Sequence, residues 1–343
     1  MNVLEQLMAT HIAQHGPLDV GQFMSFALSH PEHGYYMKAD PFGRGGDFVT
    51  APEVSQMFGE VLGAWSAFQW EAMGRPDDFV MLECGPGRGT LMADMLRATQ
   101  AVQGFYDAAQ ITLMEISPVL KKEQGDVLTD YQPRWIESLQ ELSSEVPVIA
   151  IGNEFLDALP FRQLEYKQGH WVERVIVFQD DAFTFMHRDA PKALWPDFGT
   201  PHNGDIYEFS SARLGFISQL CERIKETKGA GLFIDYGHGK SGFGDTFQAV
   251  KQHGYADILS DVGDVDLTSH VDFEPLLSAV TDAGGIVQPL LDQGDFLRMM
   301  GVEARANYLK SKGAQDIDQD LARLVADDQM GTLFKVMDFR YGY

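Results

Sequence analysis

The 343-residue sequence contains only two cysteines, Cys84 and Cys221, and they lie far apart in the chain. Neither has a second cysteine near it, so the sequence offers neither a disulfide framework nor a cysteine-rich zinc site. The ten histidines show no H-E-x-x-H or comparable ligand spacing. We therefore expect no metal site, and we expect a reducing compartment, with the cytoplasm as the default.

Basic residues are also scarce: 26 lysines and arginines stand against 50 aspartates and glutamates, which gives a formal net charge of −24. Such an acidic protein is repelled by nucleic acids and anionic membranes, so a basic protein or a cationic group is the more natural partner. No apolar run approaches the roughly 18 residues that a membrane-spanning helix needs. No signal-peptide core is present, and the first arginine is Arg44, which argues against a mitochondrial transit peptide. We expect no membrane insertion and no nucleic-acid partner.

The most informative segment is Met81–Leu91, MLECGPGRGTL. Its apolar run ends at Glu83, and three glycines follow at alternate positions, Gly85, Gly87 and Gly89. Glycine adopts backbone conformations that a Cβ would forbid, and apolar residues resume at helical spacing beyond the glycines. The segment therefore predicts a buried strand that turns into a helix, with backbone N–H groups facing a ligand at the carboxyl edge of a parallel sheet.

The spacing of these glycines favours one class of ligand. A dinucleotide-binding loop has the pattern G-x-G-x-x-G, whereas this segment reads E-x-G-x-G-x-G. A carboxylate at Glu83 would repel a diphosphate, but it suits S-adenosylmethionine (SAM), which carries an ammonium and a sulfonium. The spacing favours a class I methyltransferase over an NAD-dependent dehydrogenase, and a plain tight turn is the third alternative.

A second acid ends the next predicted strand, Gln110–Glu115. Ser117 and Pro118 then suit the cap and the first turn of a helix. A carboxylate at Glu115 can accept hydrogen bonds from both ribose hydroxyls of a nucleoside, a need that SAM and NAD share. The alternative is that this carboxylate only stabilises the start of the helix.

Polar residues also follow a further buried strand, Pro147–Ile151. Asn153, Glu154 and Asp157 come after it and would lie beside the glycine segment, at the edge where open α/β sheets place their chemistry. The alternative is that Asn153 caps the next helix and Asp157 offsets its dipole. His238 and His270 can also face this cleft, although a histidine in a loop is more often a simple hydrogen-bonding group.

The remaining pattern divides the chain into three parts. Residues 1–75 are expected to form an N-terminal helical region, and residues 76–160 and 229–343 an α/β core. Residues 161–228 read as an inserted antiparallel β-meander and helix that would contact a substrate or a second subunit, as in a homodimer. The glycine-rich loop at 43–50 reads equally well as a lid over a ligand or as a plain connection.

Seven motifs, in this order, resemble the MidA-type family of SAM-dependent methyltransferases, whose mitochondrial members are assembly factors of respiratory complex I. The motifs are His33–Tyr36, Gly45–Phe48 with Thr50–Glu53, Glu83–Thr90, Glu115–Pro118, Asn153–Pro160, Ile234–His238 and His270–Phe273. They extend from residue 33 to residue 273, so the resemblance covers most of the chain.

The resemblance implies a Rossmann-like class I fold with a seven-stranded sheet whose last strand is antiparallel. It also implies a protein arginine N-methyltransferase that forms symmetric dimethylarginine on the large quinone-side subunit of complex I during assembly. The cofactor-binding residues implied are Glu83, Gly85, Gly87, Gly89, Glu115, Ile116, Asp47 and Thr50. The alternative within this family is an assembly chaperone that binds SAM without turnover.

Arginine methylation gives the acids after Pro147–Ile151 a chemical role. A guanidinium is a poor nucleophile while its charge is delocalised. Two fixed carboxylates can orient it through its N–H donors, localise the charge away from the attacking nitrogen and accept a proton. Glu154 and Asp157 are the candidates for this catalytic pair, with Asn153 beside them.

We predict that the protein binds SAM and S-adenosylhomocysteine and does not bind NAD. Gly87→Val should abolish this binding, because a branched side chain would intrude where the ligand meets the backbone. Isothermal titration calorimetry measures both effects. Heat from NAD, with none from either adenosyl ligand, would contradict the methyltransferase interpretation.

Overall fold

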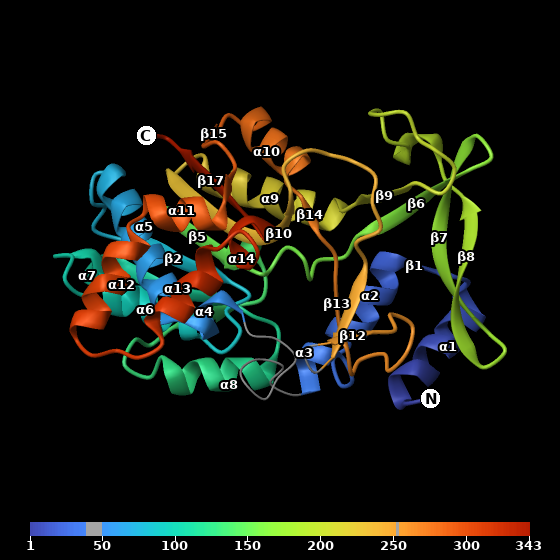
Figure 1. Cartoon of the computed structure of the whole chain (residues 1–343), viewed down its shortest axis with the longest axis horizontal. Coiled ribbons are helices and arrows are strands. Elements are labelled where there is room, and N and C mark those ends of the chain that lie inside the picture. The colour runs from blue at the N-terminus through green and yellow to red at the C-terminus, as the bar shows by residue number, and fades with distance from the viewer. Residues whose placement is uncertain (39–49, 252–253) are drawn as a thin grey trace.

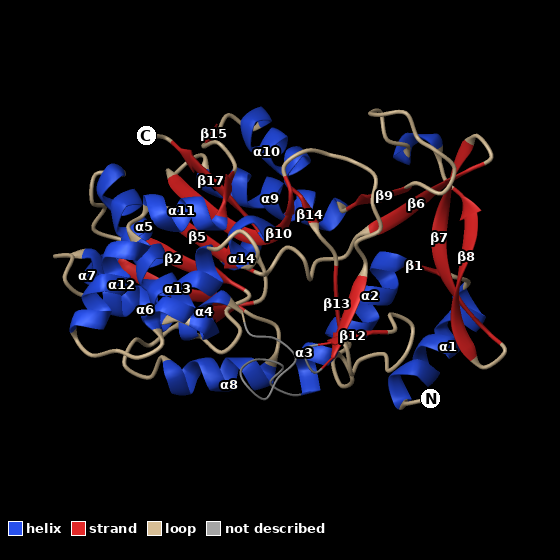
Figure 2. Ribbon diagram, in the orientation of Figure 1, coloured by secondary structure: helices blue, strands red, loops and turns tan. Residues whose placement is uncertain are grey.

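The computed structural model describes residues 1–38, 50–251 and 254–343. The described chain folds into two lobes, a larger one built on a mixed β-sheet and a smaller one built on two antiparallel sheets (Figures 1 and 2). In this part of the chain, no helix has both the length and the apolar character needed to cross a membrane.

Nine strands of the described chain form the main sheet. Seven lie side by side in the order β15–β17–β10–β5–β2–β3–β4, while the short strands β14 and β16 pair with β10 and β17. Their bounds are β2 (Phe79–Cys84), β3 (Ala109–Met114), β4 (Arg134–Ile136), β5 (Val148–Asn153), β10 (Gly229–His238), β14 (Val271–Asp272), β15 (Ile286–Val287), β16 (Leu291–Asp292) and β17 (Phe334–Tyr341). Neighbours from β4 to β10 are parallel, and β17 is antiparallel to β10. The predicted class I sheet with its antiparallel last strand is confirmed.

Helices cover both faces of this sheet, which explains why β2 and β5 are buried along their whole length. Along β2, Val80 and Leu82 join the apolar cluster of one face and Met81 joins that of the other. One face is covered by α5 (Gln56–Ala72), α6 (Thr90–Thr99), α11 (Gln293–Met299), α12 (Val302–Ser311) and α13 (Ile317–Val325), and the other by α9 (Ser211–Ile224) and α10 (Phe273–Asp282). The remaining helices of this lobe are α4 (Ala51–Val54), α7 (Phe105–Ala108), α8 (Pro118–Val127), α14 (Met330–Leu333) and the 3-10 helix η1 (Leu139–Glu141).

The smaller lobe combines the N-terminal helices with two antiparallel sheets. The predicted meander is present as β6, β7 and β8, and β1 and β9 extend it, while β12, β11 and β13 form the second sheet in that order. Their bounds are β1 (Leu18–Asp19), β6 (Arg162–Lys167), β7 (His170–Gln179), β8 (Ala182–Asp189), β9 (Ile206–Phe209), β11 (Gln248–Lys251), β12 (Gly254–Ala256) and β13 (Asp266–Thr268), with helices α1 (Val3–His15), α2 (Val20–Ser29), α3 (Tyr35–Lys38) and η2 (Lys192–Leu194). Phe23, Phe161 and Phe247 belong to a separate apolar core that the N-terminal helices and these sheets share.

The packing differs in two places from the division expected from the sequence. The helix of the expected insertion, α9, packs on the main sheet through Ile217 and Leu220. Conversely, Phe247, Ala249 and Leu267, which were expected to belong to the α/β core, pack with the N-terminal helices. The chain therefore passes between the two lobes more than once, and composition alone did not mark these crossings.

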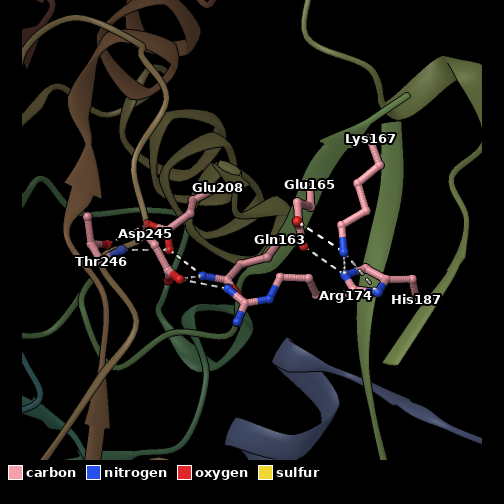
Figure 3. Close-up of polar contacts among 8 residues, drawn as sticks. All are labelled: Gln163, Glu165, Lys167, Arg174, His187, Glu208, Asp245 and Thr246. Carbon is pink, nitrogen blue, oxygen red and sulfur yellow. Dashed lines mark hydrogen bonds and ion pairs between the residues drawn. The ribbon is translucent and has the colours of Figure 1, made fainter. Parts of the chain in front are cut away.

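A network of polar side chains ties one crossing segment to the smaller lobe (Figure 3). The buried Gln163 on β6 donates to Glu208 on β9 and to Asp245, at 2.7 Å and 2.8 Å. Arg174 on β7 donates to the same Asp245 at 2.7 Å, and the backbone N–H of Thr246 donates to Glu208 at 3.0 Å. These bonds fix the segment that leads from the main sheet into β11.

Arg213 on α9 fixes a second junction between the lobes. The residue is 5% exposed. Its guanidinium donates to the carbonyls of Leu156 at 2.7 Å and Asp157 at 3.1 Å, which follow β5. It also donates to the carbonyl of His270 at 2.8 Å and to the hydroxyl of Ser269 at 2.6 Å, which follow β13. The planar fork of five donors suits arginine to this role.

We predict that Arg213→Met lowers the free energy of unfolding by about 3–5 kcal/mol, because several buried acceptors lose their donor and each such loss costs about 1–3 kcal/mol. Urea denaturation followed by circular dichroism measures the change. Arg75→Met is the control: Arg75 is exposed, and its side chain pairs with Glu71 four residues earlier and lies over the ring of Trp70, so we expect a change within about 1 kcal/mol. Equal, small losses of unfolding free energy in both variants would contradict this role of Arg213 at the junction between the lobes.

Candidate functional site

A cavity of about 490 Å³ opens at the carboxyl edge of the main sheet, between the two lobes. The larger lobe contributes the glycine segment, the residues after β3 and β4 and the turn after β5 to its walls, and the smaller lobe contributes Tyr36 and Asp266. A smaller cavity of about 40 Å³ shares Thr50, Gly85 and Glu154 with it. The predicted strand ends are thus brought to one place.

The glycine segment has the geometry predicted from its sequence. Gly85, Gly87 and Gly89 have φ angles of 65°, 52° and 86°, in the left-handed region that favours glycine. A Cβ on Gly85 would lie 2.9 Å from the ring of Phe155, so a larger residue would not fit there. Gly89 caps α6, whose N-terminus faces the strand ends.

Glu83 is 2% exposed, at the end of β2. Within the described chain, one oxygen of its carboxylate, Oε2, has no hydrogen-bond partner, and the residue lines the smaller cavity. Burial raises the pKa of Glu83 well above its ordinary value, while the backbone N–H of Met92 lowers it. A buried carboxylate with a spare acceptor, beside a glycine cradle, fits the ammonium end of SAM.

Glu115 stabilises the start of a helix, one of the two roles that its sequence left open, and it also faces the large cavity. Its Oε1 accepts the backbone N–H groups of Ile116 and Ser117, at 2.8 Å and 2.7 Å, and so stabilises the start of α8. It also lines the large cavity together with Ile116. Gln124 on α8 donates to Oε2 of Glu115 at 3.2 Å and to the carbonyl of Gly87 at 2.7 Å, which joins the acid to the glycine segment.

Sequence reasoning missed the residues that follow β4. Glu137, Ser138 and Leu139 line the large cavity beyond Ile116. A signal was present, because Trp135 and Ile136 suit a short strand, and the carboxyl end of a strand parallel to β3 reaches the same edge as that of β3.

No helix follows β5, so the alternative roles for Asn153 as a helix cap and Asp157 as a dipole partner are wrong. The reason is local: Glu154 has a left-handed φ of 50°, and its N–H donates to the carbonyl of Ile234 on β10 at 2.9 Å. The chain instead makes a tight turn, which directs Glu154 and Asp157 toward the large cavity. Asn153 lines the smaller cavity with Glu83.

Glu154 remains partly accessible from the cavity, although protein surrounds it. Its Oε1 accepts the side-chain amide of Asn153 at 3.2 Å and the backbone N–H of Ala51 at 3.3 Å. Burial, followed by the charge of Asp157, raises the pKa of Glu154 to about 8. Its carboxyl group can therefore change protonation state near neutral pH.

Asp157 is 5% exposed and is held by neighbours on β10. Tyr236 donates its hydroxyl to Oδ2 of Asp157, while Asp235 accepts the backbone N–H groups of Leu156 and Asp157, at 2.9 Å and 3.1 Å. Among the described residues, Oδ1 of Asp157 has no hydrogen-bond partner. Burial raises the pKa of Asp157, and the bond from Tyr236 lowers it.

The other predicted residues are placed as follows. Thr50 lines both cavities and precedes α4, and its side chain makes no capping bond to that helix; the carboxylate of Glu53 accepts a hydrogen bond from the hydroxyl of Thr90 at 2.7 Å. His238 and His270 line a different cavity of about 390 Å³, beside β9 and the start of α10. Asp47, with most of the loop at 43–50, lies outside the described residues.

Comparisons with known proteins agree with the fold and with the predicted cofactor. A family model for S-adenosyl-L-methionine-dependent methyltransferases matches residues 61–289. The mitochondrial protein arginine methyltransferase NDUFAF7 of Danio rerio is 32% identical, over 96% of this chain and 84% of that protein, and its Drosophila melanogaster homologue is 32% identical, over 97% and 84%. A crystal structure from Burkholderia thailandensis, bound to S-adenosyl-homocysteine, has 26% identity and a TM-score of 0.84, over 98% of this chain and 91% of that one.

We predict that the free energy of unfolding falls as the pH rises from 4.5, the ordinary pKa of a glutamate, to about 8, the pKa of Glu154 in the folded protein. The folded state holds this proton more tightly than the unfolded state, so ionisation in that window favours unfolding. Glu154→Gln should flatten the decline, although Asp157 and Asp235, whose pKa values burial also raises, keep part of it.

Melting temperatures at about pH 6 and about pH 9 measure this dependence. Glu226→Gln, at an exposed position on the protein surface, should keep the slope of the wild type. If Glu154→Gln has the same slope as the wild type, Glu154 does not titrate as described.

Proposed function

Because this chain belongs to the MidA-type family of S-adenosyl-L-methionine-dependent methyltransferases, we propose that it methylates arginine side chains of a protein. The observation that carries the proposal is the convergence of Glu154 and Asp157 on the cavity that contains the glycine segment. Relatives named as protein arginine methyltransferases support it.

We propose further that the product is symmetric dimethylarginine and that the substrate is the large quinone-side subunit of respiratory complex I, methylated during assembly. This part of the proposal rests on the family resemblance. The excess of acidic over basic residues, which gives the net charge of −24, suits a cationic target. The cytoplasm remains the proposed compartment, although the curated relatives are named as mitochondrial.

One group of residues in the site suits the cofactor, and another suits the substrate. When bound, SAM supplies a methyl group activated by its sulfonium. Glu83, the glycine segment and Glu115 would hold it, since they provide an ammonium acceptor, a close backbone approach and an acid beside the ribose position. Glu154 and Asp157 line the same large cavity, to which Tyr36 and Asp266 also contribute.

The two acids can also make the guanidinium of arginine, a poor nucleophile, more reactive. Asp157 Oδ1 can accept an N–H of the guanidinium, which fixes its plane and draws positive charge away from the attacking nitrogen. The nitrogen that gains the methyl group must lose a proton. Glu154 is placed to accept it, because its pKa of about 8 allows the carboxylate to gain a proton near neutral pH.

We predict that Asp157→Asn and Glu154→Gln each slow methyl transfer by about 2–4 kcal/mol in transition-state stabilisation, the scale of a fixed electrostatic group at a reacting centre. The affinity for SAM should change far less, since neither amide alters the glycine segment or Glu83. The measurement combines calorimetry with labelled SAM and a lysate of cells that lack this gene, followed by mapping of the modified residue.

Glu226→Gln serves again as the surface control and should transfer methyl groups at the wild-type rate. Wild-type rates in both amide variants would show that these acids do not act on the substrate. A wild-type protein that binds SAM tightly but transfers no methyl group to any protein would favour the chaperone alternative.

A further inference from the structure

Asp157, the acid proposed to bind the guanidinium, is held through both its backbone and its side chain. Asp235 on β10 accepts its backbone N–H at 3.1 Å, and Arg213 donates to its carbonyl at 3.1 Å. Tyr236 donates its hydroxyl to Oδ2, while Oδ1 has no hydrogen-bond partner in the part of the chain that the structure describes. Rotation of an aspartate carboxylate about its last side-chain bond is soft, so a hydrogen bond to one oxygen decides where the other points.

Tyr236 is itself fixed by its surroundings. The residue is 7% exposed, and its ring packs edge-on against the rings of His270 and Phe334, with centroids 5.4 Å and 5.5 Å away. Burial raises the pKa of Tyr236 well above its ordinary value, and the charges of Asp157 and Asp235 raise it further, so the hydroxyl keeps its proton. Tyr236 is therefore a rigid donor directed at Asp157.

The hydroxyl of Tyr236 also forms a hydrogen bond with the side chain of Thr268, which lies on β13 of the smaller lobe (Figure 1). An ionised carboxylate only accepts hydrogen bonds, so Tyr236 donates to Asp157 and accepts from Thr268. Gln248 on β11 in turn donates to the hydroxyl of Thr268, at 3.3 Å. These donors all point the same way, and in such a chain each hydrogen bond strengthens the next. The smaller lobe thus takes part in orienting an acid of the larger lobe.

Tyr236 and Thr268 have no direct access to a ligand in the large cavity. Thr268 is 2% exposed, and among the described residues that line this cavity Asp157 is present but Tyr236 and Thr268 are not. Their effect on a bound substrate must therefore pass through Asp157. A small misplacement of a group at a reacting centre slows the reaction even when the ligands still bind.

We propose that Tyr236, oriented by Thr268, is a positioning residue for methyl transfer: it holds Oδ2 of Asp157 so that Oδ1 is presented to the guanidinium of the substrate arginine. The inference rests on the proposed arginine methylation. It assigns a role in the reaction to two buried residues that belong to different lobes.

The test measures the initial rate at which labelled methyl groups pass from SAM to a lysate of cells that lack this gene. For Tyr236→Phe we expect a rate about 10- to 100-fold below that of the wild type, as for the loss of a hydrogen bond to a charged group. The Kd for S-adenosylhomocysteine should stay within about twofold, because the substitution leaves the glycine segment and Glu83 unchanged. A wild-type rate in Tyr236→Phe would overturn the proposal.

A double-variant cycle separates positioning from a merely structural role. In an Asp157→Ala background no carboxylate remains for Tyr236 to hold, so adding Tyr236→Phe should slow the transfer by less than about twofold. If Tyr236→Phe instead causes the same loss in both backgrounds, Tyr236 acts independently of Asp157 and the proposal is wrong.

Tyr341→Phe is the matched control. Tyr341 is also buried in the main sheet, on β17, and its hydroxyl donates to the carbonyl of Val280 at 3.0 Å. It is not among the described residues that line the large cavity. This variant also loses a buried hydrogen bond, but it should transfer methyl groups at the wild-type rate. An equal loss of rate in Tyr341→Phe and Tyr236→Phe would show that destabilisation, and not positioning, slows the reaction.

If Tyr236→Phe fails to fold, Thr268 decides the question. Thr268→Val removes the hydroxyl that meets Tyr236 and keeps the shape of the side chain, so the rate should fall by about 2- to 10-fold, as for a neutral hydrogen bond. Thr268→Ser keeps the hydroxyl and should retain the wild-type rate. Equal rates in these two variants would overturn the proposal.

Failure of the proposed function would look different. A wild-type protein that binds S-adenosylhomocysteine but transfers no methyl group to arginine overturns the proposed function itself. A wild-type protein that methylates arginine, with the wild-type rate kept in Tyr236→Phe and Thr268→Val, overturns only the positioning role.

Discussion

Burial of carboxylates at one edge of the main sheet is the constraint on which the rest of the structure depends. Glu83, Glu154, Asp157 and Asp235 lie at or just beyond the ends of parallel strands, and burial raises the pKa of each. Parallel strands end at a common edge, so the apolar runs that build the core also bring these acids to that edge, where Glu154 and Asp157 line the large cavity and Glu83 lines the smaller one. The arrangement destabilises the free protein and favours a complex with a cationic ligand.

Much of this edge was predictable from the sequence because its signals are local. The apolar runs that became β2, β3 and β5 each stop at a polar residue, and alternate glycines mark the turn after β2. The meander was equally visible, since its alternation and turns lie within one continuous segment. Fold class, cofactor and the acids after β5 therefore followed from short stretches of sequence and the family they resemble.

The remaining features depend on contacts between residues far apart in the chain. Asp266 accepts a hydrogen bond from Tyr36, 230 residues earlier in the chain. Arg213 donates to carbonyls that lie 56 and 57 residues away, before and after it in the chain. The spacing of apolar residues along the chain does not predict such distant pairings. The turn after β5 escaped prediction for another reason: a left-handed backbone at Glu154, a residue type that rarely adopts it, replaced the expected helix.

The bonds of Arg213 go mainly to main-chain carbonyls rather than to side chains. Every amino acid has such a carbonyl, so these bonds of the junction do not depend on which side chains stand at Asp157 or His270. Substitutions there can change the surroundings of the neighbouring cavities while the docking of the lobes is preserved. The architecture thus separates what holds the protein together from what its cavities recognise, and recognition can diverge among relatives while the scaffold is inherited intact.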